Sequence, residues 1–220
     1  MRRIVVLDLD DTLFPERQYV LSGFRAVDAW LRESRGVDGF YGQAKALRDA
    51  GARANIFGPA LAALGCWSDQ VLIDTLVTIY REHRPVLTLY EDARWAIDVL
   101  GARGPLGLIS DGHLVAQERK LAALGIADAF HAIVLSDALG REAWKPSPRP
   151  YQRLMELIPG PSSDFVYIAD NPRKDFVTAR RLGWATIQVA RPDGVYHGVE
   201  EDLEYRADAV ITSLCELEKM

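Results

Sequence analysis

Two carboxylates close the first apolar run of the chain. Asp8 and Asp10 stand in the segment IVVLDLDDTL, residues 4–13, directly after β-branched and apolar residues that are typical of a buried strand. Side chains two apart on a strand point the same way, so we expect these carboxylates to share one small volume. Like charges at that distance oppose each other's ionisation unless a cation or a proton intervenes. The pair therefore indicates catalysis or metal binding, since a turn that begins with Asp explains Asp10 but not Asp8.

Further apolar runs predict the sheet that must position these side chains. A strand is predicted over residues 3–9, and later runs at 106–109, 132–135, 165–168, 185–189 and, more weakly, 209–211. Segments with helical periodicity lie between them, at 91–101, 114–124, 148–157 and 173–182. Strands that alternate with helices indicate βαβ units. The sequence therefore predicts an α/β fold with a Rossmann-like, three-layer core, in which helices cover both faces of a parallel sheet.

One long interval interrupts this alternation. Residues 15–85 have helical periodicity throughout, with glycines that divide the interval into about four helices and Pro15 and Pro85 at its two ends. We interpret this interval as an inserted helical subdomain that caps the core. Residues 1–14 and 86–220 then form the core itself.

Composition limits the class of protein. The 220 residues are 49% hydrophobic, which is enough for a substantial core, and the formal net charge of −5 gives no electrostatic reason to bind nucleic acid or an anionic membrane. Cys66 and Cys215 lie in unrelated segments, which favours reduced thiols over a disulfide framework. No run has the length of a signal peptide or a membrane span. We expect a cytoplasmic protein.

Other predicted strands also end in polar residues. The run at 106–109 is followed by Ser110, Asp111 and Gly112, the run at 132–135 by a loop with Lys145, and the run at 165–168 by residues 170–175. In open parallel sheets, ligands bind beyond the carboxyl ends of the strands. These segments are therefore expected to meet at one site.

This ordered set resembles the motifs of the haloacid dehalogenase superfamily of aspartyl phosphatases. The segment from Asp8 to Thr12 resembles its first motif, Ser110 its second, Lys145 its third, and Asp170 with Asp175 its fourth. The helical insertion after the first motif is similar to the cap of that family. The chain departs from the pattern at residue 169, where Ala stands in place of a frequent Gly.

The resemblance implies a role for each carboxylate. Asp8 would be the nucleophile that forms an aspartyl-phosphate intermediate. Asp10 would be the general acid for the leaving oxygen and then the general base for water. A Mg²⁺ cofactor would be held by Asp8, Asp170 and the carbonyl of Asp10, since Mg²⁺ favours oxygen ligands and keeps several waters.

The resemblance also implies how the phosphate is bound. Ser110 and Thr12, together with the N–H groups of Asp111 and Gly112, would hold the phosphoryl oxygens at the start of a helix. Lys145 would add a positive charge. The implied role of Asn171 and Asp175 is to orient the water ligands of the metal.

The function implied is Mg²⁺-dependent hydrolysis of a small phosphorylated metabolite. The dehalogenases of the family lack a carboxylate at the position of Asp10, because a halide leaves without a proton, so a phosphatase is favoured over a dehalogenase. A phosphomutase with the same nucleophile stays open, as does a binding or regulatory module without catalysis. The oligomeric state is not indicated by the sequence.

Overall fold

The computed structural model describes residues 3–192, 194–196, 198 and 201–219. The chain divides into two compact units. Met1–Pro15 and Thr88–Met220 form the first, here called the sheet unit, and Glu16–Leu87 form the second, the helical unit.

The sheet unit contains one parallel sheet of six strands in the order β3-β2-β1-β4-β5-β6. The strands are β1 (Ile4–Leu7), β2 (Leu106–Ser110), β3 (Ala132–Leu135), β4 (Phe165–Ala169), β5 (Ala185–Val189) and β6 (Ala209–Ile211). Every strand predicted from the sequence is present, and the Rossmann-like class is confirmed. The order places β1 between β2 and β4, so the strand that precedes Asp8 is central.

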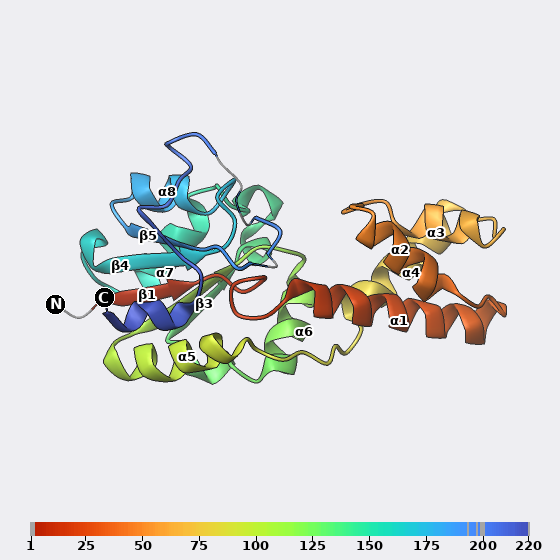
Figure 1. Cartoon of the computed structure of the whole chain (residues 1–220), viewed down its shortest axis with the longest axis horizontal. Coiled ribbons are helices and arrows are strands. Elements are labelled where there is room, and N and C mark those ends of the chain that lie inside the picture. Colours follow the sequence, from red (N-terminus) through yellow and green to blue (C-terminus); the bar gives the residue numbers. More distant parts are fainter. Residues whose placement is uncertain (1–2, 193, 197, 199–200, 220) are drawn as a thin grey trace. The chain divides into compact units, whose positions relative to one another are not determined.

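Helices cover both faces of the sheet. They are α5 (Glu91–Arg103), α6 (Leu114–Leu124), α7 (Arg149–Leu157) and α8 (Phe176–Arg181), with short 3₁₀ helices η1 (Ala127–Ala129), η2 (Ser136–Leu139), η3 (Arg141–Ala143), η4 (Ser162–Asp164) and η5 (Leu214–Lys219). Figure 1 shows α5 and α8 on opposite sides of the sheet. Helix α8 begins later than the predicted 173–182, because residues 171–175 form a turn in which the N–H of Asp175 donates to the carbonyl of Asn171.

The core beneath α7 and α8 is aromatic. Alternate residues of β4, Phe165 and Tyr167, face Tyr151 of α7 and Trp184 in one buried cluster. Trp184 stacks on Phe165 with ring centroids 4.6 Å apart. Alternate residues of a strand point to opposite faces of the sheet. This packing therefore determines which β4 side chains face each of the two helix layers.

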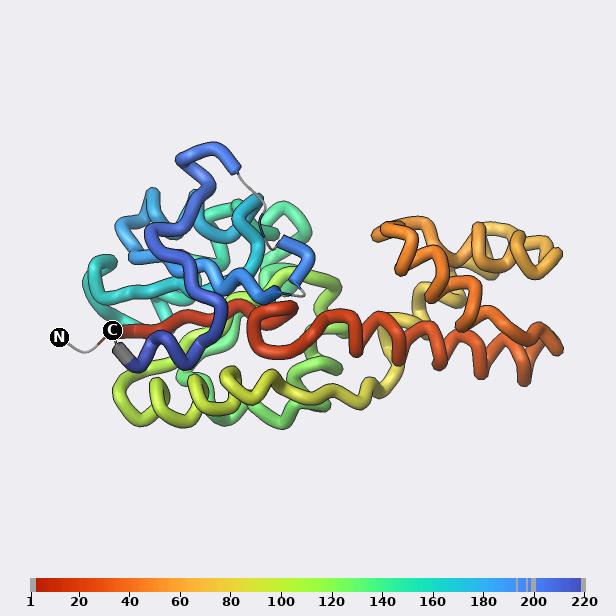
Figure 2. The backbone as a smooth tube through the Cα atoms, viewed as in Figure 1, coloured from red at the N-terminus to blue at the C-terminus, as the bar shows by residue number. Residues whose placement is uncertain are grey.

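The helical unit consists of α1 (Glu16–Arg35), α2 (Phe40–Asp49), α3 (Phe57–Ala63) and α4 (Gln70–Glu82). Within this unit, α1 packs against α2 and α4, as the red to yellow part of the tube shows (Figure 2). Their shared core buries apolar side chains that include Phe24, Leu31, Phe40, Leu61 and Leu76. None of the helices among the described residues is both long and apolar enough to cross a membrane.

An arginine fixes the loop that follows Asp8. The guanidinium of Arg191 donates to the carbonyl of Thr12 at 2.7 Å and to both carboxylate oxygens of Asp92 at 3.0 and 3.1 Å, and it lies 3.7 Å from the ring centroid of Tyr90. Burial by itself would raise the pKa of Asp92, but the hydrogen bonds from Arg191, from the N–H of Leu214 and from the hydroxyl of Ser213 hold that pKa below its usual value. The ion pair therefore connects the Thr12 loop to the first turn of α5.

Candidate active site

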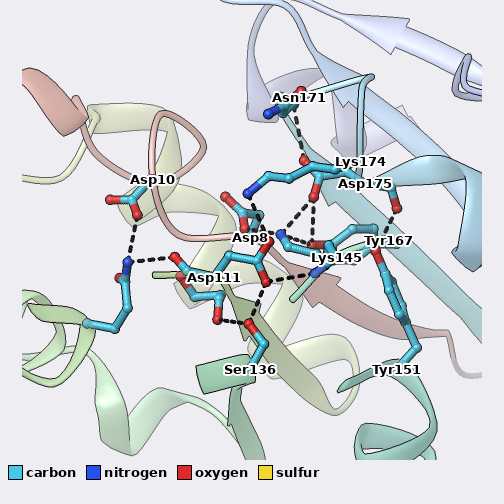
Figure 3. Close-up of polar contacts among 12 residues, drawn as sticks. Asp8, Asp10, Asp111, Ser136, Lys145, Tyr151, Tyr167, Asn171, Lys174 and Asp175 are labelled. Carbon is cyan, nitrogen blue, oxygen red and sulfur yellow. Dashed lines mark hydrogen bonds and ion pairs between the residues drawn. The ribbon is translucent and has the colours of Figure 1, made fainter. Parts of the chain in front are cut away.

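A buried lysine joins two carboxylates at the carboxyl edge of the sheet (Figure 3). The Nζ atom of Lys145 lies 2.6 Å from an oxygen of Asp8 and 2.7 Å from an oxygen of Asp175. The side chains of Lys145 and Asp175 have no exposed surface, and that of Asp8 is 7% exposed. The N–H of Asp8 donates to the carbonyl of Ile168 at 2.9 Å, which holds the residue beside the end of β4.

Burial determines the protonation of this group. It raises the pKa of Asp8 to about 7, with the charge of Lys145 opposing the rise and that of Asp175 adding to it. Burial would lower the pKa of Lys145, but the carboxylates of Asp175 and Asp8 hold it well above its usual value. Lys145 therefore carries a positive charge that stabilises the ionised form of Asp8 against the effect of burial.

Two tyrosines of the aromatic core form hydrogen bonds with Lys145 and with its partner Asp175. Lys145 donates to the hydroxyl of Tyr167 at 2.8 Å, and Tyr151 donates to the carbonyl of Asp175 at 2.8 Å. The second oxygen of Asp175 accepts from the N–H of Asn171 at 3.1 Å. Asp175 thus binds Lys145 and the Asn171 turn, and the packing of the hydrophobic core fixes the position of the ammonium group.

Among these buried carboxylates, Asp170 has the fewest neighbouring groups that stabilise its negative charge. Burial raises its pKa well above the usual value, and the negative charges of Asp8 and Asp175 raise it further. Within the described part of the chain, no hydrogen bond or ion pair reaches its side-chain oxygens. A buried carboxylate beside other carboxylates is stable in its charged form only when a cation is near.

This donor set fits Mg²⁺. Among the described residues, no three His, Cys, Asp or Glu side chains lie close enough together to hold a metal by themselves. Mg²⁺ needs fewer protein side chains than three, because one or two carboxylates, a carbonyl and several waters commonly complete its octahedral shell. Asp8 and Asp170 would supply the two carboxylates of such a site.

The carboxylate of Asp10 has partners of its own. Nζ of Lys120 lies 2.7 and 2.8 Å from its two oxygens, and Nε2 of Gln117 donates to it at 3.0 Å. Asp8 and Asp10, whose carboxylates the sequence predicts to share one small volume, therefore bind different lysines. Because β1 ends at Leu7, strand alternation does not extend over these two residues.

Two buried hydroxyls at the strand ends have no hydrogen-bond partner among the described residues. They are Oγ of Ser110, which ends β2, and Oγ1 of Thr12, in the loop after Asp10. Such a group costs about 1–3 kcal/mol and calls for an explanation in a native fold. Both residues are those that the sequence predicts to bind phosphoryl oxygens, which are strong acceptors.

Asp111 contributes through its side chain as well as its backbone. Burial would raise the pKa of Asp111, but the charges of Lys145 and Lys174 lower it below its usual value. Its oxygens accept from Nζ of Lys174 at 3.0 Å, from the N–H of Lys145 at 3.2 Å and from the hydroxyl of Ser136. Asp111 therefore orders the third-motif loop rather than presenting a free carboxylate.

Sequence reasoning missed several of these partners. Lys120, Lys174, Gln117 and Ser136 lie on helices or loops and match no motif by spacing, although the chain has only five lysines. Three of those five surround the site, at 120, 145 and 174. The scarcity of lysine was the one available signal.

Replacing Ser110 by alanine is expected to separate function from stability. The Ser110→Ala change removes a buried hydroxyl that has no hydrogen-bond partner among the described residues, so the free energy of unfolding should not fall and should rise by up to about 1–3 kcal/mol, while kcat/KM for a phosphate ester should fall by about 10-fold or more. Steady-state kinetics and urea unfolding measure the two quantities.

Ser136→Ala is the matched control. The Ser136 hydroxyl is fully buried and lies within hydrogen-bond distance of two acceptors, the carbonyl of Ser110 and the carboxylate of Asp111, so its loss should lower the free energy of unfolding by about 1–3 kcal/mol. Equal stability losses in the two variants would contradict the assignment of Ser110 to ligand binding.

Comparison with known proteins agrees with the motifs. The family model for haloacid dehalogenase-like hydrolases matches residues 58–189, more than half of the chain. The chain belongs to this family, as its resemblance predicts.

Two curated relatives are phosphatases. A glyceraldehyde 3-phosphate phosphatase from Methanocaldococcus jannaschii is 28% identical over 97% of this chain and 94% of its own length. A phosphoserine phosphatase from Thermus thermophilus is 27% identical over 86% of this chain and 89% of its own length. In fold, the chain is similar to a 2-haloacid dehalogenase from Pseudomonas syringae pv. Tomato, with a TM-score of 0.69 and 24% identity over 100% of this chain and 97% of that chain.

Proposed function

We propose that this protein is a Mg²⁺-dependent phosphatase that hydrolyses a small phosphorylated metabolite through an aspartyl-phosphate on Asp8. The observation that carries the proposal is that Asp8 forms an ion pair with the buried Lys145 and lies near enough to the buried Asp170 for their charges to interact. A carboxylate that attacks a phosphate dianion meets like charge, so it needs cations on both sides of the reacting group.

The first half-reaction transfers the phosphoryl group. A carboxylate oxygen of Asp8 attacks phosphorus, the bond from phosphorus to the ester oxygen breaks, and Asp10 donates the proton that converts that oxygen into an alcohol. Lys145 and the hydroxyl of Ser110 stabilise the charge on the phosphoryl oxygens. Asp8 and Asp170 would hold a Mg²⁺ ion, which would supply further charge neutralisation for the phosphoryl group.

The second half-reaction restores the enzyme. Asp10, now ionised, accepts a proton from water as the water oxygen attacks phosphorus, and the bond from phosphorus to Asp8 breaks. Inorganic phosphate leaves and Asp10 is protonated again. Each group ends in the state in which it began, so no co-reactant other than water is consumed.

The relatives support the substrate class. Glyceraldehyde 3-phosphate and phosphoserine, the substrates that their names state, are three-carbon phosphate monoesters. We propose a substrate of similar size. The helical unit interrupts the sheet unit soon after Asp10, and we propose that this insertion, predicted over 15–85, is a cap that excludes water and selects the substrate.

Free phosphate release tests the function. The purified protein should hydrolyse p-nitrophenyl phosphate, glyceraldehyde 3-phosphate or phosphoserine in Mg²⁺. Removal of the metal with excess EDTA should lower kcat/KM by about 100-fold or more, and added Mg²⁺ should restore it.

Other outcomes identify the alternatives. Chloride release from a 2-chloro acid without phosphatase activity would indicate a dehalogenase, for which the fold similarity is the specific observation. An isomerised phosphate ester in place of free phosphate would indicate a phosphomutase. The absence of turnover on all of these compounds would indicate a binding module.

A further inference from the structure

The general acid proposed above is held by a buried lysine and a buried glutamine that lie outside the motifs. Gln117 and Lys120 are three residues apart on α6, so they lie on the same face of that helix. Both residues are nearly inaccessible, with exposures of 2% and 3%. Lysine is almost never buried to this extent unless it is paired, and its ammonium contacts both oxygens of Asp10.

The contacts use most of the bonding capacity of the Asp10 carboxylate. An ionised carboxylate has about four acceptor positions. Lys120 occupies one on each oxygen, and Nε2 of Gln117 occupies another on the second oxygen. About one position then stays open, on a side chain that is 21% exposed. The carboxylate is thus held in one orientation, and its one open position is the one that would carry the proton when Asp10 acts as the general acid.

Gly112 makes room for this arrangement. A Cβ atom at residue 112 would lie 2.2 Å from Nε2 of Gln117, far inside van der Waals contact, and the φ of +134° disfavours any other residue there. The absence of a side chain lets the Gln117 amide donate to the carbonyl of Asp111 at 2.7 Å as well as to Asp10. The second motif is thereby tied directly to the first.

We propose that Lys120, with Gln117, is a positioning residue that orients Asp10 for proton transfer to the leaving oxygen. The inference rests on the proposed phosphatase function and adds to it a residue outside the four motifs described above. Neither side chain contacts the phosphoryl group in this scheme. Their loss should therefore matter only when the leaving group needs a proton.

Two esters with different leaving groups provide the test. The p-nitrophenolate ion leaves without a proton at neutral pH, whereas an alkoxide such as that from glycerol phosphate must be protonated. The ratio kcat/KM includes only the steps up to departure of the leaving group, so it isolates the first proton transfer.

For Lys120→Met, we expect kcat/KM for glycerol phosphate to fall by about 100-fold and kcat/KM for p-nitrophenyl phosphate by less than about 3-fold. Lys120→Arg, which retains the charge and the donors, should recover part of the loss. Gln117→Leu should show the same substrate dependence at smaller amplitude. Arg119→Met, which removes an exposed positive charge from the same helix, is the control and should behave as the unmodified protein.

The outcomes distinguish this inference from the function on which it rests. Equal losses on both esters, or no loss on either, would overturn the positioning role while leaving the phosphatase intact. A faster reaction of Lys120→Met with glycerol phosphate would also overturn it, because Lys120 would then restrain Asp10 instead of orienting it. Failure of the unmodified protein to hydrolyse either ester would overturn the phosphatase proposal and this inference together.

Discussion

Asp8→Asn is expected to lower phosphate release by about 10⁴-fold or more, to the limit of detection, because an amide cannot attack phosphorus. The change keeps the shape of the side chain. Lys145 retains its 2.7 Å ion pair with Asp175, so the site should not lose its buried charge balance. Release of inorganic phosphate from an aryl phosphate in Mg²⁺ measures the loss, and urea unfolding checks that the fold persists.

The control for this prediction is Asp98→Asn, which makes the same chemical change at an exposed position on α5. It should leave kcat within about 2-fold of the unmodified value, since surface substitutions rarely act at a distance. Activity in a folded Asp8→Asn variant above about one hundredth of the normal rate would refute the assignment of Asp8 as nucleophile.

Lys145→Met is expected to have the largest effect on stability. It leaves the carboxylates of Asp8 and Asp175 buried without their shared counter-ion, and breaking a buried ion pair in this way costs about 3–5 kcal/mol. The free energy of unfolding should fall by that amount in urea denaturation. The measurement is made in EDTA, because a bound divalent cation would replace part of the missing charge.

A second substitution tests the cause of this loss. In Lys145→Met combined with Asp175→Asn, one unpaired charge is removed, so the double variant should be more stable than the single Lys145 variant by about 1–3 kcal/mol. Additive losses in the two substitutions would show that Asp175 and Lys145 do not act as a pair. Activity should stay absent in the double variant, since the cation that faces the phosphoryl group is still missing.

The sequence alone was sufficient to predict the strands, the parallel class of their sheet and the edge of the sheet at which the candidate site lies. All six strands are short apolar runs; the pattern is clear for the first five and weaker for β6, a three-residue edge strand with one exposed residue. Asp8 and Asp170 come directly after β1 and β4, Ser110 is the last residue of β2, and Lys145 lies in the loop region after β3. Their meeting at one edge follows from the parallel direction of the strands.

Only the tertiary structure shows which charged side chains form ion pairs with each other. Local sequence cannot show that Lys145 bridges Asp8 and Asp175, or that Asp10 binds a lysine 110 residues further along the chain. These pairs depend on the position where each strand ends and on how α6 packs beside the Asp10 loop. Periodicity determines elements because it reflects local backbone geometry, whereas ion pairing is determined by distances between segments that only the packed core brings together.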